Sequence, residues 1–146
     1  MPSALDVAHY FVTQVDEESG DSISNLKLQK LLYYAQGFHL AAYGEPLFPE
    51  RIKAWVHGPV VPEVYHQLKQ YASGPVVIAG EVDRSQFAQK SLELLDEVYS
   101  VYGQYSAAAL RNMSHEEPPW TQTPQGETIS HGLMTEFFKT RLASEN

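Results

Sequence analysis

The stretch SNLKLQKLLYYAQGFHLAAYG at residues 24–44 decides the fold, because its apolar residues repeat at the spacing of an α-helix. One face carries residues three, four and seven positions apart: Leu28, Leu31, Leu32, Ala35, Phe38 and Ala42. More apolar residues lie on the other sides of the helix, among them Leu26, Tyr33 and Leu40. A helix that is apolar on most sides is normally central in a fold. The sequence therefore predicts a central helix over residues 25–43.

The ends of this helix are marked by residues that favour helix termini. Ser24 can cap the free backbone N–H groups of the first turn, and Gly44 stands where a helix commonly ends in a left-handed residue. Gly37, in mid-helix, costs roughly 1 kcal/mol relative to alanine. Such a residue indicates that another backbone passes close by.

Outside this helix, apolar periodicity and capping residues predict further helices, for a total of about six. Their ranges are residues 3–15, 60–72, 83–103 and 106–113, with a last helix opened by Ser130. HEEPPW at residues 115–120 is expected to end the preceding helix, because two prolines cannot continue one. Short strands are predicted near residues 52–56 and 75–79, and their pairing stays open. We expect one mainly α domain spanning residues 1–146.

The composition narrows the classes of function. The chain has a net charge of −8, with 10 Lys and Arg residues that form no basic run. Nucleic-acid binding needs clustered cations, so this charge argues against it and suits a basic protein partner instead. No apolar run is long enough for a membrane span, and there is no cysteine for a disulfide or a thiolate site. A cytoplasmic location is expected.

The search for catalytic motifs finds no phosphate-binding loop, no nucleophile elbow and no dinucleotide fingerprint, so no cofactor and no enzyme activity are predicted. The six histidines lack the spacing of a helical zinc site. One alternative of a different class remains. A small metal-dependent hydrolase could be built from His57, His66, His115 and Glu117.

The most distinctive short segment is WVHGPVV at residues 55–61. Gly58 permits backbone angles that other residues resist, and Pro59 restricts the next one, so a rigid corner is predicted. The corner could present Trp55 and His57 outward to a partner. Alternatively, Trp55 is a core anchor and His57 bonds a backbone group. Trp120 has the same two interpretations: it locks the HEEPPW segment onto the bundle, or it belongs to an interface.

Three segments in order, LKLQKLLYYAQGFHLAAYGEPLF, IKAWVHGPVVPEVYHQLK and SHEEPPW, carry a specific resemblance. The chain resembles the Panacea domain family, also called SocA-like or GepA-like, a group of phage-associated proteins, from about residue 4 to about residue 140. The motifs fall on Leu28, Lys30, Leu31, Tyr33, Tyr34, Gln36, Trp55, Gly58, Pro59, Val60, Tyr65, His115, Pro118 and Trp120.

The resemblance implies an antitoxin of a type II toxin–antitoxin system, which neutralises its toxin by direct protein–protein binding. The toxins of the family include small alarmone-synthetase-like enzymes and other inhibitors of translation. A second mode within the family is a proteolytic adaptor, which delivers the toxin to a cytoplasmic protease. The residues expected to contact the toxin are the polar and aromatic subset of the motifs and their neighbours: Lys27, Lys30, Tyr34, Trp55, His57, Glu63 and Tyr65.

Overall fold

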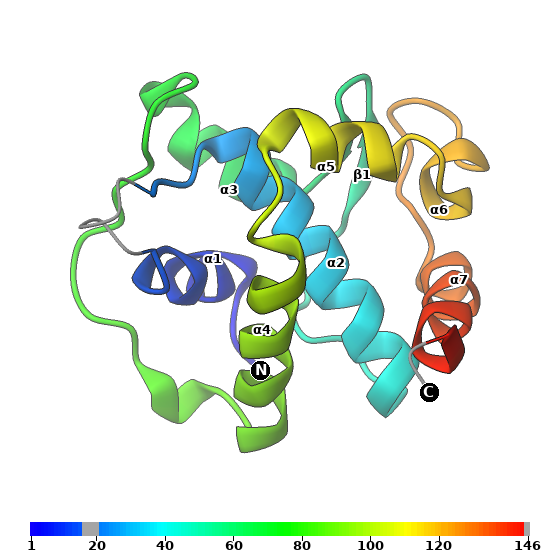
Figure 1. Cartoon of the computed structure of the whole chain (residues 1–146), viewed down its shortest axis with the longest axis horizontal. Coiled ribbons are helices and arrows are strands. Elements are labelled where there is room, and N and C mark those ends of the chain that lie inside the picture. Colours follow the sequence, from blue (N-terminus) through cyan, green and yellow to red (C-terminus); the bar gives the residue numbers. More distant parts are fainter. Residues whose placement is uncertain (16–20, 145–146) are drawn as a thin grey trace.

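A computed structural model describes residues 1–15 and 21–144, and these form a helical domain with one small sheet (Figure 1). The α-helices are α1 (Ala4–Thr13), α2 (Asn25–Tyr43), α3 (Pro62–Leu68), α4 (Gln89–Tyr102), α5 (Ala107–Ser114), α6 (Pro118–Thr121) and α7 (His131–Ser144). The sheet contains β1 (Lys53–Trp55) and β2 (Gly58–Val60), and 3-10 turns lie at η2 (Lys69–Tyr71) and η3 (Arg84–Gln86). None of the described helices combines the length and apolarity needed to cross a bilayer.

Helix α2 runs through the middle of the molecule, as predicted, and spans residues 25–43 (Figure 1). It contacts helices α1, α3, α4, α5 and α7 and strand β2, and every side chain from Leu28 to Leu40 is buried. The Ser24 hydroxyl accepts from the Lys27 N–H, and Gly44 ends the helix at a φ of +70°. The apolar side chains on the different faces of α2 are buried because these neighbouring elements surround the helix.

Gly37 marks a close approach, but the prediction of a neighbouring backbone is wrong. The neighbour is the ring of Phe138 on α7, and a Cβ at Gly37 would lie 2.1 Å from its Cε2 atom. Phe138 is fully buried and meets the rings of Tyr33 and Phe38 edge to face. Glycine is therefore required at this position so that an aromatic ring can lie against the helix.

Two predictions about elements need correction, and one short helix was not predicted. The segment 83–103 is not one helix, because Phe87 is extended and buried, and it separates η3 from α4. Residues 75–79 form no strand, although the Val76 N–H donates to the Ile23 carbonyl at 2.9 Å. HEEPPW ends the preceding helix as predicted, because α5 stops at Ser114. Its two prolines then begin the short helix α6, since the first turn of a helix needs no N–H donors. The described residues thus contain seven α-helices rather than six.

The predicted strand near 52–56 is confirmed as the first strand of a hairpin. Strands β1 and β2 are antiparallel, with Trp55 opposite Gly58. Gly58 has a φ of +108°, and a Cβ there would lie 2.9 Å from the Lys30 side chain. On the other side of β1, the N–H groups of Gly126 and Ile129 donate to the carbonyls of Ala54 and Ile52. The hairpin is therefore held from both sides.

Candidate partner-binding site

Three of the residues predicted to contact a partner, Trp55, His57 and Tyr65, line a single pocket of about 280 Å³. We call it the hairpin pocket, and its other lining residues are Leu26, Gln29, Val56, Val60, Gln125 and Gly126. The hairpin, the first turn of α2, helix α3 and the segment at 125–126 together form its walls. Residues that are far apart in the sequence thus share one concave surface.

The aromatic wall of the pocket consists of Trp55 and Tyr65, whose rings meet edge to face at 5.1 Å. Both side chains are half-buried. Within the described residues, the indole N–H of Trp55 and the hydroxyl of Tyr65 have no hydrogen-bond partner. The backbone of this wall is nevertheless fixed, because the Trp120 indole donates to the Trp55 carbonyl at 2.9 Å. The pocket therefore offers two unused donors on a rigid frame.

His57 is exposed in the hairpin turn, and its Nδ1 accepts from the Nε of Arg111 on α5 at 3.3 Å. Since Nδ1 accepts, a neutral His57 carries its proton on Nε2. His57 therefore bonds a side chain, not the backbone group considered from the sequence. Arg111 was missed by sequence reasoning, because nothing in the segment around it distinguishes a site residue from an ordinary helix-surface cation.

Lys30 and Tyr34 were predicted to touch the partner, but the structure buries both side chains completely. The ammonium group of Lys30 lies under the hairpin and donates to the Pro59 carbonyl at 2.8 Å. Burial, together with the smaller effect of the nearby Arg111 guanidinium, lowers the pKa of Lys30 to about 7. Lys30 thus supports the corner from below and is removed from the accessible surface.

Tyr34 belongs to a buried network around Glu117. The hydroxyls of Tyr33 and Tyr34 donate to the two carboxylate oxygens of Glu117 at 2.9 and 3.1 Å. Burial raises the pKa of Glu117 to about 7, against the opposing effect of these hydrogen bonds. Tyr34 also stacks on Tyr102 at 4.1 Å. The network attaches the start of α6 to the central helix.

The remaining two predicted contact residues, Lys27 and Glu63, lie outside the pocket. The Lys27 ammonium donates to the Gly103 carbonyl at 2.6 Å and so ties α2 to the end of α4. Glu63 is exposed in the first turn of α3 and lines a separate depression with Arg51 and Lys53. The structure therefore brings together three of the seven predicted residues, buries two and places two elsewhere.

The alternative metal site is not assembled. No three His, Asp or Glu side chains of the described residues are grouped so that they could hold a metal ion. Glu117 accepts from two tyrosines instead, and His115 stacks on Trp120 with ring centroids 4.1 Å apart. The Nε2 of His115 is buried and has no hydrogen-bond partner among these residues. Trp120 attaches the HEEPPW segment to the hairpin, which agrees with one of the two roles predicted for it.

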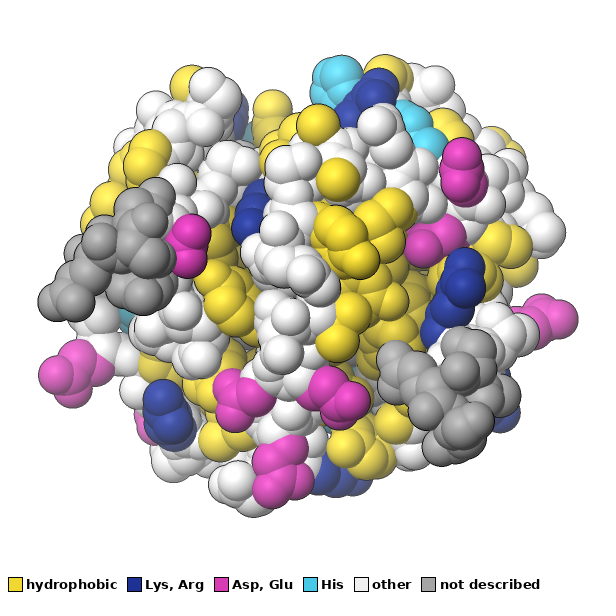
Figure 2. Space-filling view, viewed as in Figure 1, with side chains coloured by type: hydrophobic (Ala, Val, Ile, Leu, Met, Phe, Trp, Pro, Cys, Tyr) yellow, Lys and Arg dark blue, Asp and Glu magenta, His cyan; other side chains and the backbone are white. Residues whose placement is uncertain are grey.

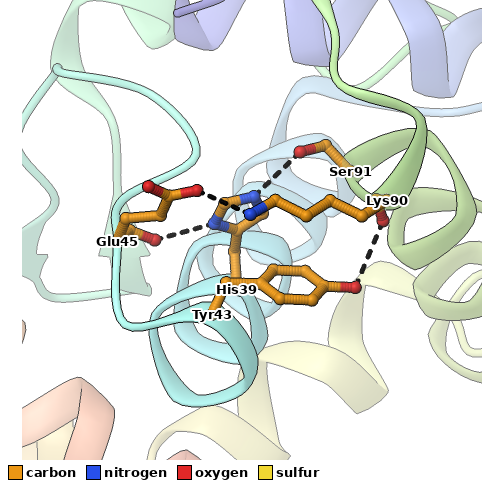
Figure 3. A network of polar contacts seen from close by, with 5 residues as sticks. All are labelled: His39, Tyr43, Glu45, Lys90 and Ser91. Atoms are coloured by element: carbon orange, nitrogen blue, oxygen red, sulfur yellow. Dashed lines mark hydrogen bonds and ion pairs between the residues drawn. The ribbon is translucent and has the colours of Figure 1, made fainter.

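A second histidine, His39, lies in a polar network between the end of α2 and the start of α4 (Figure 3). Its Nδ1 lies 2.7 Å from the Glu45 carbonyl, and its Nε2 lies 2.9 Å from the Ser91 hydroxyl. A carbonyl only accepts, so the proton lies on Nδ1 and Ser91 donates to Nε2. Both His39 and Ser91 are buried, at 3% and 5% exposure. This pair joins two helices through a buried hydrogen bond.

An apolar groove is also visible between α4 and α7 (Figure 2). Its apolar lining residues are Phe38, Leu94, Val98, Val101, Tyr102 and Leu142. It is small, about 40 Å³, and it lies away from the hairpin pocket. Sequence analysis did not single it out as a site, because its residues carry the same periodicity as the core.

Comparison with known proteins places the chain in a family. The model of the antitoxin SocA-like, Panacea domain family matches residues 28–121, and the chain belongs to this family. The matched segment runs from α2 through α6 and includes Trp55, His57, Tyr65 and Arg111. This finding confirms the resemblance described from the sequence.

Among curated proteins, the chain is similar to antitoxin SocA of Caulobacter vibrioides (strain NA1000 / CB15N). The two are 34% identical over 124 residues, which cover 76% of this chain and 65% of the relative. The chain therefore spans a little less than two thirds of the length of that relative. No solved structure matches the chain.

Proposed function

We propose that this chain is an antitoxin that neutralises a protein toxin by binding it directly. Membership of the antitoxin SocA-like family is the observation that carries the proposal. The similarity to antitoxin SocA, which extends over 76% of the chain, supports the same role. The antitoxin would act stoichiometrically in the cytoplasm, as the second member of a type II toxin–antitoxin pair, and would perform no reaction of its own.

The hairpin pocket is the surface that we propose for toxin contact. Tryptophan, tyrosine and arginine dominate the binding energy of protein interfaces, and here Trp55, Tyr65 and Arg111 occupy adjoining positions. The pocket is also preformed, since Trp120 and Lys30 bond to the backbone on both sides of the hairpin turn. Such a frame loses little conformational entropy when a partner binds.

The partner that we propose is a toxin that inhibits translation, such as a small alarmone-synthetase-like enzyme. Co-expression with the protein encoded by the adjacent reading frame tests the antitoxin role. The expected result is restored growth and a complex that co-purifies in equal amounts. Toxicity that persists beside a well-expressed, folded chain would contradict the antitoxin role.

Two substitutions test the surface. Trp55→Ala should weaken the complex by about 2–4 kcal/mol if the indole is an anchor of the interface. Tyr43→Ala is the matched control, because Tyr43 is an exposed aromatic residue at the far end of α2. Equal binding by both variants would remove the hairpin pocket from the proposal.

Toxin half-life, measured with and without the chain, separates masking of the toxin from adaptor-mediated degradation, since only an adaptor shortens the half-life.

A further inference from the structure

One edge of the hairpin pocket carries a positive charge that no acidic side chain of the described residues pairs with. Arg111 bonds only to His57 and to the Asn112 side chain in the described residues. The one ion pair found there joins Lys90 and Glu45, away from this edge. Figure 2 shows Lys or Arg and His side chains side by side where Figure 1 places the hairpin and α5.

Further nitrogen atoms lie around Arg111. Lys30 is buried under Gly58, and a Cβ at Gly58 would lie 3.1 Å from its Nζ atom. His115, which follows the last residue of α5, has a buried Nε2 without a hydrogen-bond partner in the described residues. Glu116 is exposed beside His115 in the sequence, yet it forms no ion pair with these groups within the described part of the chain. Nitrogen atoms thus gather around Arg111, and no carboxylate of the described residues is paired with its guanidinium.

The apolar part of the pocket lies against this cationic edge, because His57 belongs to both. The pocket volume of about 280 Å³ lies at the lower end of the range of volumes found for small-molecule sites. The pocket therefore suits a protruding side chain better than a cofactor. Val56, in the hairpin turn, is 53% exposed although it is apolar. An apolar surface beside an unneutralised arginine fits a segment that presents both an apolar side chain and a carboxylate.

We propose that the hairpin pocket binds an acidic–apolar segment of the protein partner. An aliphatic or aromatic side chain of that segment enters the pocket against the wall formed by Trp55 and Tyr65, and a neighbouring Asp or Glu carboxylate pairs with Arg111 and His57. This inference rests on the proposed function and specifies the chemistry of the partner. It differs from the expectation drawn from net charge. Charge at long range favours a basic partner, whereas this edge selects a carboxylate at short range.

A nucleic acid is the other anion that such an edge could attract. The chain has 18 Asp and Glu residues against 10 Lys and Arg, so a polyanion is repelled by the molecule as a whole. A single carboxylate on a folded protein avoids most of that repulsion, because at physiological salt charges interact over only about 8 Å. The protein segment is therefore the occupant that the charges favour.

The test uses the purified full chain and the protein encoded by the adjacent reading frame, together with overlapping peptides that cover that partner. Three variants are compared: Arg111→Gln, Arg111→Glu and a control, Lys139→Glu. The control changes the net charge by the same amount as Arg111→Glu, but at an exposed site on α7. We expect Arg111→Gln to weaken binding by about tenfold and Arg111→Glu by more, with Lys139→Glu close to wild type. The peptides bound by the wild-type chain should contain Asp or Glu beside an apolar residue.

The outcomes distinguish this inference from the proposed function. A stable complex with equal affinity for all variants, or a preference for basic peptides, would overturn the inference and leave the antitoxin role intact. A gel shift with RNA or DNA at physiological salt that Arg111→Glu abolishes would also overturn it. If the two full-length proteins fail to associate at all, both the inference and the proposed function are contradicted. Thermal unfolding of each variant verifies that Arg111 substitutions leave the fold unchanged.

Discussion

At the residue scale, Glu117 is the most consequential ionisable group in the core. Its carboxylate is 7% exposed and accepts hydrogen bonds from Tyr33 and Tyr34. Its pKa is about 7 in the folded chain, against an ordinary value of 4.5. The folded state therefore holds this proton more tightly than the unfolded state. Glu117 stabilises the fold fully below pH 4.5, and this contribution is lost as the pH rises to about 7.

Replacement of Glu117 by glutamine should remove this dependence on pH. Between pH 6 and pH 8, the unfolding free energy of the wild type should fall by about 1 kcal/mol relative to that of Glu117→Gln. Glutamine keeps a carbonyl that can accept from one tyrosine and cannot ionise. Urea unfolding of both proteins at the two pH values measures the difference. Parallel stabilities at both values would show that Glu117 is ionised in the fold at pH 6.

Lys30 has the opposite dependence on pH. Its pKa is about 7 when folded and 10.5 ordinarily, so the unfolded state holds the proton more tightly. Stability from this group is present above about pH 10.5 and is lost as the pH falls to about 7. Lys30→Met should abolish this change, and the wild type should gain about 2 kcal/mol relative to the variant between pH 7 and pH 9. Chemical denaturation at both values is the measurement, and identical slopes with pH would contradict it.

At the element scale, the packing of α7 on α2 depends on the missing side chain at Gly37. Alanine favours a helix by roughly 1 kcal/mol over glycine. Here, however, its methyl group would overlap the buried ring of Phe138, whose Cε2 and Cδ2 atoms lie 2.1 and 2.2 Å from the Cβ position. Overpacking of this kind costs about 1–3 kcal/mol. The clash exceeds the gain in helix propensity.

We therefore expect Gly37→Ala to destabilise the chain by up to about 2 kcal/mol, the balance of these two effects. Phe138→Leu provides the matched second mutation, because it shortens the side chain that meets the new methyl group. In a double-mutant cycle, the cost of Gly37→Ala should be smaller in the Phe138→Leu background. Additive costs would place the strain elsewhere along α2.

At the scale of the whole molecule, stability should be highest in α2, because other elements surround it. Its buried side chains contact five helices and β2, whereas α4 and α7 each have an exposed face. Amides from Leu31 to Leu40 should therefore show the slowest hydrogen exchange and open only in global unfolding. Native-state exchange read by mass spectrometry or NMR measures this. Slower exchange in α4 than in α2 would contradict a fold centred on α2.

Much of the architecture was predictable because it depends on neighbours in the chain. The limits of α2 follow from the Ser24 cap and from Gly44, and both act within one turn. The strand near 52–56 was predicted from alternation and is present as β1. The separation of η3 from α4 was not predictable, since Phe87 is extended and its side chain is buried beside Tyr10 of a distant helix.

The candidate site was only partly predictable for the same reason. Trp55, His57 and Tyr65 were singled out from their residue types, and the structure places them around one pocket. Lys30 and Tyr34 were included because they are polar, yet they are buried by partners 29 and 83 residues away, the Pro59 carbonyl and Glu117. Nothing in the sequence around Arg111 marks it as a site residue. It becomes part of the candidate site only because α5 contacts the hairpin.

By itself, the sequence determined the helical class, the central helix, the rigid corner at Gly58 and the family, because periodicity, caps and motifs are local properties of the chain. Only the tertiary structure decided which polar side chains are buried and which stay accessible. Burial and hydrogen bonding depend on residues that meet across the fold, as Glu117 does with two tyrosines of α2 and Arg111 does with His57.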